Sequence, residues 1–222
     1  MNDTEPIRRT MFVTAGAVAV VLLTAALASA STVSRLEVQV FRWLNQGPDI
    51  FGRPVWFMMQ LGSVVGGLLA AVVLLAVTRQ PRGALAGAIA VVAAWLAAKV
   101  IKALVDRGRP ADYLADVHTR FEPLGYGQGY PSGHTAVAFA LATVIAGSLR
   151  GWWRAVPFVV ATIVAFGRVY FGAHFPLDVV GGAAIGVAIG ALTRQALHLP
   201  TGLIGSSRPG TRVPRVDPVP DS

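Results

Sequence analysis

The sequence predicts an all-α membrane protein, a polytopic bundle of six transmembrane helices with both termini in the cytoplasm. Hydrophobic residues make up 54% of the 222 positions and charged residues only 14%. The hydrophobic residues gather in runs of about 20, the length that a helix needs to cross the hydrocarbon core of a bilayer. The charged residues cluster between these runs instead of following amphipathic faces, which excludes an ordinary soluble domain.

The six apolar runs are expected to form one membrane domain over residues 11–198. Residues 1–10 precede this domain as a cytoplasmic N-terminal segment. Residues 199–222 are rich in Pro, Ser and Arg, and we expect them to form a disordered cytoplasmic tail. The expected spans are residues 11–30, 56–77, 83–105, 134–149, 155–171 and 178–197.

The first apolar run admits a second interpretation, as a cleavable signal. Arg8 and Arg9 precede the run, which ends on Ala28-Ser29-Ala30, a small-residue pattern typical of signal cleavage sites. The run is long for a signal peptide, so an uncut membrane anchor is the favoured interpretation. The orientation of the later spans is the same under both interpretations.

The placement of the arginines predicts the orientation of the bundle. The loops on one side carry many arginines, whereas the arginines on the other side are offset by Asp and Glu, so the arginine-rich side is expected to face the cytoplasm. The net charge of +8 then reflects topology and attraction to anionic lipid. We therefore expect a multi-pass protein of the plasma membrane with no nucleic-acid partner. The cytoplasmic arginines are Arg8, Arg9, Arg79, Arg82, Arg150, Arg154, Arg194, Arg208, Arg212 and Arg215.

Four polar segments lie at the ends of the predicted spans, and the alternating direction of the spans places all four on the outer face. Random placement would seldom achieve this, so a functional site is expected at the extracytoplasmic surface. The segments are Lys102 with Arg109-Pro110, then Pro131-Ser132-Gly133-His134, then Arg168, and finally His174 with Asp178.

The first three segments have the chemistry of phosphate binding. Lys102 and Arg109 are seven residues apart, which is two turns along one face of a helix. Ser132 occupies an N-cap position, and Gly133 lets an anion approach the free N–H groups at the start of a helix. Arg168 lies in the last turns of an apolar span, where an unpaired guanidinium is costly. Each segment alone also fits a structural role, but together they predict an anion site.

His174 and Asp178 supply the reactive pair. Their separation of four residues lets the carboxylate reach one imidazole nitrogen, fix the tautomer and make the other nitrogen a better nucleophile. Together with His134 and three cations, the pair predicts phosphoryl transfer. The sequence contains no carboxylate cluster or His/Cys spacing typical of a metal site, and the cations can neutralise the phosphate. We therefore expect neither a metal nor a cofactor.

These motifs resemble the three signature motifs of the type 2 phosphatidic acid phosphatase superfamily of membrane lipid phosphatases. The resemblance runs from residue 83 to about residue 193 in motif order. It implies that Lys102, Arg109 and Arg168 bind the phosphate with Ser132 and the Gly133 amide. It further implies that His174 is the nucleophile oriented by Asp178, and that His134 is the general acid. The one departure is Gly167, where the family usually has serine.

The resemblance implies a lipid phosphatase that acts through a phosphohistidine on an outer-leaflet substrate, with undecaprenyl diphosphate as the first choice. Phosphatidate and phosphatidylglycerol phosphate are the alternatives. Two other classes stay open, a vanadate-dependent haloperoxidase, whose relatives are larger soluble proteins, and a non-catalytic lipid or anion transporter. The sequence does not indicate an oligomeric state. We interpret the loop over residues 111–130 as a partly mobile cover for the site.

Overall fold

The computed structural model describes residues 4–30, 32–120 and 127–199. Every secondary-structure element within these residues is a helix, which confirms the predicted all-α class. The elements are α1 (Thr4–Ala28), α2 (Arg35–Asn45), η1 (Asp49–Phe51), α3 (Gly52–Met59), η2 (Gln60–Gly62), α4 (Val64–Thr78), α5 (Pro81–Leu104), α6 (Pro110–Tyr113), α7 (Gly133–Ser148), η3 (Gly151–Ala155), α8 (Val156–Tyr170) and α9 (Pro176–Ala196).

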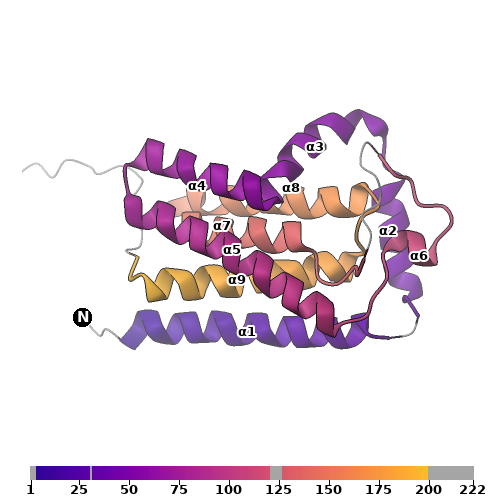
Figure 1. Ribbon diagram of the computed structural model, residues 1–222, viewed down its shortest axis with the longest axis horizontal. Coiled ribbons are helices and arrows are strands. Elements are labelled where there is room, and N and C mark those ends of the chain that lie inside the picture. The colour runs from indigo at the N-terminus through magenta and orange to yellow at the C-terminus, as the bar shows by residue number, and fades with distance from the viewer. Residues whose placement is uncertain (1–3, 31, 121–126, 200–222) are drawn as a thin grey trace, which may run out of the picture.

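The long helices lie side by side, and the short ones gather at one end of the bundle (Figure 1). Helices α1, α4, α5, α7, α8 and α9 run along the long axis, while α2, α3 and α6 lie at the right-hand end in this view, which we call the site end. The start of α1 and the end of α9 both lie at the opposite end. The predicted tail falls almost entirely outside the described residues.

Helix α7 is the centre of the bundle and packs against α9, α5 and α8, while α1 covers the other side of α9. Small residues make this close packing possible, as in many membrane bundles where backbones approach each other. The main buried cluster consists of Ala86, Ala90, Ala94, Ala98, Ala136, Ala140, Val144 and Ile185. Because the first four lie four residues apart on α5, they form one continuous stripe facing α7 and α9.

A stripe of glycines on α9 brings this helix against α7. A Cβ atom added at Gly186 would lie 2.8 Å from the Ala140 nitrogen, and one at Gly190 would lie 2.7 Å from the Ala140 carbonyl oxygen. At Gly182 an added Cβ would meet the Ser132 carbonyl oxygen. The stripe therefore sets the distance between the two helices that carry His134 and Asp178.

The structure supports membrane spans but not the full predicted count. Four described helices are long and apolar enough to cross a membrane, Ile7–Ala28 within α1, Pro81–Leu104, Gly151–Tyr170 and Pro176–Ala196, and a bent pair of helices could make a fifth. The remaining predicted span, residues 134–149, corresponds to α7, which at 16 residues is shorter than the four spans just given. Its length of about 24 Å falls short of a hydrocarbon core of about 30 Å.

The predicted span over residues 56–77 is interrupted, which the hydrophobicity pattern did not reveal. The chain bends by 76° between Asp49–Gly62 and Val64–Thr78. Ser63 adopts an extended conformation, donates its hydroxyl to the Gln60 carbonyl at 2.7 Å and accepts the Gly66 N–H at 2.9 Å. A serine side chain that bonds neighbouring backbone in this way competes with helix continuation. The bend therefore follows from a local capping motif within an apolar run.

Candidate active site

The candidate site lies at the site end of the bundle, where α5, α7, α8 and α9 begin or end. His174 is in the turn between α8 and α9, and Asp178 is in the first turn of α9. The Asp178 Oδ2 atom lies 3.5 Å from His174 Nδ1 and accepts the backbone N–H of Phe175 at 2.8 Å. Both side chains are buried. Since Nδ1 faces the carboxylate, Nε2 is the ring nitrogen that could act on a substrate.

The surroundings of His174 favour its neutral form. Burial, followed by the positive charges of Arg168, Lys102 and Arg109, holds the pKa of His174 well below its usual value. An imidazole must be neutral to act as a nucleophile, because the protonated ring has no free lone pair. The same three cations that could hold a phosphate therefore also favour the neutral form of the imidazole.

Arg168 is joined to His174 through the backbone as well as by charge. The Arg168 carbonyl accepts the N–H groups of Ala173 at 3.0 Å and His174 at 3.1 Å, which fixes the turn that follows α8. The Arg168 side chain is buried, and its Nη1 lies 3.5 Å from the sulfur of Met59 on α3. The turn thus holds a cation and an imidazole in one rigid unit.

The segment before α7 is attached directly to α9. Ser132 is the N-cap residue of α7, as predicted, but its hydroxyl does not cap the helix and instead accepts a hydrogen bond from the Thr135 hydroxyl at 3.0 Å. Its backbone N–H donates to the Asp178 carbonyl at 2.9 Å. His134, in the first turn of α7, lies close enough to interact electrostatically with Arg168, His174 and Arg109. The two histidines therefore share one site.

Lys102 and Arg109 converge on the site by a route that differs from the predicted one. Helix α5 ends at Leu104, so Arg109 does not continue its helical face and is instead the N-cap residue of α6. Pro110 and the extended residues before it explain the break. Both cations turn toward one backbone segment, with Lys102 Nζ donating to the Gln128 carbonyl at 2.7 Å and Arg109 Nε donating to the Gly127 carbonyl at 3.1 Å.

These features can be compared with known proteins. A model of the PAP2 superfamily matches residues 82–200, more than half of the chain and all of the motifs described above. The chain belongs to the PAP2 superfamily. The crystal structure of Aquifex aeolicus LpxE is similar with a TM-score of 0.62 and 29% sequence identity, and the match covers 73% of this chain and 96% of LpxE.

This PAP2 protein is also similar to two other bacterial proteins. YbjG of Escherichia coli K12, provisionally named an undecaprenyl-diphosphatase, is 27% identical over 169 residues, which are 74% of this chain and 84% of YbjG. The crystal structure of a PAP2-type phosphatidylglycerolphosphate phosphatase from Bacillus subtilis has a TM-score of 0.66 at 21% identity. That match covers 82% of this chain and 94% of the Bacillus chain and shows a shared fold.

The departure at Gly167 has a packing explanation in this PAP2 protein. A Cβ atom at Gly167 would lie 3.0 Å from a Val55 methyl group and 3.4 Å from the Met59 sulfur. Both neighbours belong to α3, the first part of the bent pair. Glycine therefore lets α3 lie against α8, where a serine side chain would be crowded.

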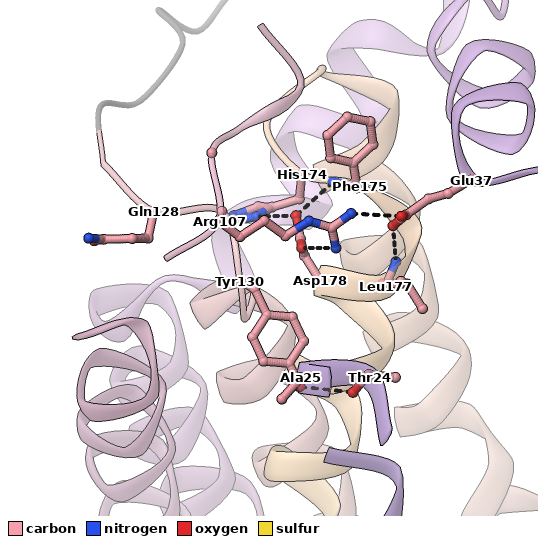
Figure 2. A network of polar contacts seen from close by, with 12 residues as sticks. Thr24, Ala25, Glu37, Arg107, Gln128, Tyr130, His174, Phe175, Leu177 and Asp178 are labelled. Atoms are coloured by element: carbon pink, nitrogen blue, oxygen red, sulfur yellow. Dashed lines mark hydrogen bonds and ion pairs between the residues drawn. The ribbon is translucent and has the colours of Figure 1, made fainter. Parts of the chain in front are cut away.

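Sequence reasoning missed two buried residues of the site, Arg107 and Glu37. The sequence places both among the charges of the outer loops, where nothing in the pattern distinguishes them from solvated residues. In the structure Arg107 lies between two carboxylates, donating to Asp178 at 3.0 Å and to Glu37 at 2.6 Å (Figure 2). The Arg107 side chain is 2% exposed and that of Glu37 is 5% exposed, so this pair belongs to the interior.

Other charges near the site also pair with one another and fix the first part of the loop that follows α6. Arg42 of α2 forms an ion pair with Asp116 at 2.9 Å, and the buried Arg120 pairs with Asp49 at 2.6 Å. The Asn45 side chain donates to the His118 carbonyl at 2.8 Å. The predicted mobile cover is therefore anchored as far as Arg120, and residues 121–126 lie outside the described part of the chain.

No group of three or more His, Cys, Asp or Glu side chains in the described residues is arranged to hold a metal ion. Apart from Asp178, the charged groups that act on His174 are basic, namely Lys102, Arg109 and Arg168. Such a set attracts an anion and repels a cation. The arrangement can bind a tetrahedral oxyanion beside a neutral, buried imidazole.

Proposed function

We propose that this protein is a lipid phosphate phosphatase that forms a phosphohistidine at His174. One observation carries the proposal, the buried His174–Asp178 pair that lies among three cations at one end of an apolar bundle. Membership of the PAP2 superfamily and the likeness to lipid phosphatases support the same class of reaction. The direct test is release of inorganic phosphate from lipid phosphates by the purified protein.

The proposed reaction has two displacements. In the first, His174 Nε2 forms a bond to phosphorus while the bond to the leaving oxygen breaks, and His134 gives its proton to that oxygen. Lys102, Arg109 and Arg168 hold the remaining phosphate oxygens, together with the Gly133 amide and Ser132. In the second, His134 takes a proton from water, whose oxygen displaces His174 and releases inorganic phosphate. Asp178 stabilises the positive charge that develops on the His174 ring.

The Ser132 and Gly133 roles are chemically reasonable for the observed start of α7. The first N–H groups of a helix lack partners within the helix, and the positive end of the helix dipole attracts phosphate. Gly133 is the first residue of α7 and carries no side chain that would obstruct an approaching oxygen. Because the Ser132 hydroxyl already accepts the Thr135 hydrogen, its own hydrogen is available to donate to phosphate.

Undecaprenyl diphosphate is the proposed substrate, with phosphatidate and phosphatidylglycerol phosphate as alternatives. The name given to YbjG supports this choice, and so does a site at the helix ends, where a lipid headgroup could reach it. The test is a comparison of kcat/KM over these three lipids in one detergent. If kcat/KM is highest for phosphatidate or phosphatidylglycerol phosphate, that lipid becomes the proposed substrate, and the proposed phosphatase mechanism is unchanged.

We propose that the site end faces away from the cytoplasm in the plasma membrane, as the arginine distribution predicts. Ala111 at the site end and Ala196 at the last residue of α9 are both exposed in this cysteine-free chain. An impermeant thiol reagent is expected to label Ala111→Cys in intact spheroplasts and Ala196→Cys only after lysis. The reverse labelling pattern would contradict the proposed orientation.

Catalysis is expected to proceed without a metal, because Lys102, Arg109 and Arg168 supply the positive charge that a metal would otherwise provide. Phosphate release should persist after treatment with EDTA, and vanadate should inhibit by resembling five-coordinate phosphorus. Loss of activity in EDTA with recovery on addition of magnesium would overturn the roles assigned to the three cations. The same samples would report the rival haloperoxidase activity if halide and peroxide were added with vanadate.

A further inference from the structure

Asp178 is held by more than its histidine partner. Its Oδ2 atom faces His174 and accepts the Phe175 N–H, whereas its Oδ1 atom accepts a hydrogen bond from Arg107 Nη1 at 3.0 Å. The Asp178 side chain is 0% exposed, so neither oxygen faces bulk solvent. The orientation of this carboxylate therefore depends on Arg107.

Arg107 is in turn fixed by Glu37. Its Nη2 atom donates to Glu37 Oε2 at 2.6 Å, while Glu37 Oε1 accepts the N–H of Leu177 at 3.0 Å in the first turn of α9 (Figure 2). The Arg107 guanidinium also lies 5.1 Å from the ring of Phe175. Both terminal nitrogens of Arg107 therefore donate to carboxylates of the protein itself, which does not favour binding of a phosphate by this side chain.

Arg107 and Arg109 thus have different environments although they are two residues apart. Arg109 donates at 3.1 Å and 3.4 Å to carbonyl groups that a phosphate oxygen could replace. Arg107 donates to two buried carboxylates, which a substrate could displace only by leaving two charges unpaired inside the protein. Arg109 is therefore suited to bind the substrate phosphate, and Arg107 is suited to hold the Asp178 carboxylate.

We propose that Arg107 and Glu37 are positioning residues that hold the Asp178 carboxylate in the orientation facing His174. When His174 attacks phosphorus, its ring gains positive charge, and the observed Nδ1–Oδ2 separation of 3.5 Å must shorten so that a hydrogen bond to Asp178 forms. Because Arg107 already holds Asp178 Oδ1, the Asp178 carboxylate can form this hydrogen bond through Oδ2 without rotating. Glu37 acts through Arg107 and, by accepting the Leu177 N–H, through the start of α9.

The test compares Arg107→Lys and Glu37→Gln with Arg42→Gln, a control on α2 whose ion pair with Asp116 is about half exposed. Glu37→Gln keeps the size of the side chain and an oxygen for the Leu177 N–H, so it removes the charge with the least structural change. For the two test variants, kcat and the rate of phosphohistidine formation are expected to fall on the order of 10- to 100-fold, as for other residues that orient a reactive group.

The inhibition constant for inorganic phosphate should stay at the wild-type value in both test variants, because the phosphate-binding cations are untouched. Arg109→Lys should instead weaken phosphate inhibition, since a point charge replaces a planar fork. If Glu37 acts through Arg107, the double variant Glu37→Gln/Arg107→Gln should be no slower than Arg107→Gln alone. Arg42→Gln should match the wild type throughout.

Three results would overturn the positioning role. These are an unchanged kcat in Glu37→Gln, a loss of activity that matches the loss of folded protein in a thermal unfolding assay, and a phosphate inhibition constant that rises in step with the loss of kcat. The inference rests on the proposed phosphatase function. A wild-type protein that releases no phosphate from any lipid of the panel would contradict both, whereas an active wild type with a normal Glu37→Gln variant would contradict the inference alone.

Discussion

Replacing His174 with alanine is expected to stop both turnover and phosphoenzyme formation, whatever the leaving group of the substrate. The buried imidazole beside Asp178 is the group proposed to form the bond to phosphorus, and none of the surrounding cations could take over that step. The measurement is acid-quenched trapping of labelled phosphate on the protein, combined with phosphate release. Retained phosphohistidine in His174→Ala would rule out His174 as the nucleophile.

His134→Ala should behave differently, because its proposed role is proton transfer. Loss of a general acid or base costs on the order of 10²- to 10⁴-fold, and the cost is largest for a poor alkoxide leaving group. With p-nitrophenyl phosphate, which needs little acid assistance, this variant should still phosphorylate His174. The phosphoenzyme should then break down slowly, since the attacking water has lost its base. Trapped phosphohistidine in His134→Ala and none in His174→Ala is the expected pair of results, and the opposite pair would exchange the two roles.

Gly186→Leu is expected to prevent α9 from packing against α7 and to remove most of the folded protein. An added Cβ would already lie 2.8 Å from the Ala140 nitrogen and from the Phe139 Cβ, and the helix backbones have no side-chain freedom with which to yield. Overpacking of this kind costs about 1–3 kcal/mol or more. Activity should be lost with the fold, because the same two helices carry His134 and Asp178. Thermal unfolding in detergent and the size-exclusion profile would measure the loss.

Gly16→Leu is the matched control for this substitution. Gly16 lies on α1, and a Cβ added there would meet no atom within 4 Å. Its replacement should therefore leave the unfolding temperature and the phosphatase activity at wild-type values. Equal tolerance of leucine at the two positions would contradict the close approach of α7 and α9.

The all-α class and the positions of most helices could be predicted because a membrane requires long apolar runs, and these runs are visible in sequence. The bend at Ser63 could not be predicted, because it depends on which backbone groups one hydroxyl bonds within an otherwise apolar stretch. The predicted end of α5 at residue 105 agrees with the observed end at Leu104, but Arg109 does not share the helical face of Lys102. The spacing of Lys102 and Arg109 fits a helix, but Pro110 and the contacts to residues 127–129 favour an extended segment.

The motif residues of the site could be predicted because phosphate chemistry requires a recognisable set of side chains. The structure brings His134, His174 and the three cations to one place, while their catalytic roles stay proposals. Arg107 and Glu37 could not be found in this way. Burial distinguishes them from the other loop charges, and burial depends on how α2 lies over the start of α9, which no local pattern encodes.

The position of Glu37 bears on how far the PAP2 unit can be separated from the rest of the chain. The family model begins at residue 82, yet the carboxylate that balances the buried Arg107 comes from α2, far upstream of that boundary. A fragment that starts at the boundary would keep every signature residue but would lose both the Glu37 carboxylate and the helix that covers Arg107. Transplanting residues 82–200 into another scaffold should therefore fail unless a carboxylate is supplied where α2 now provides it.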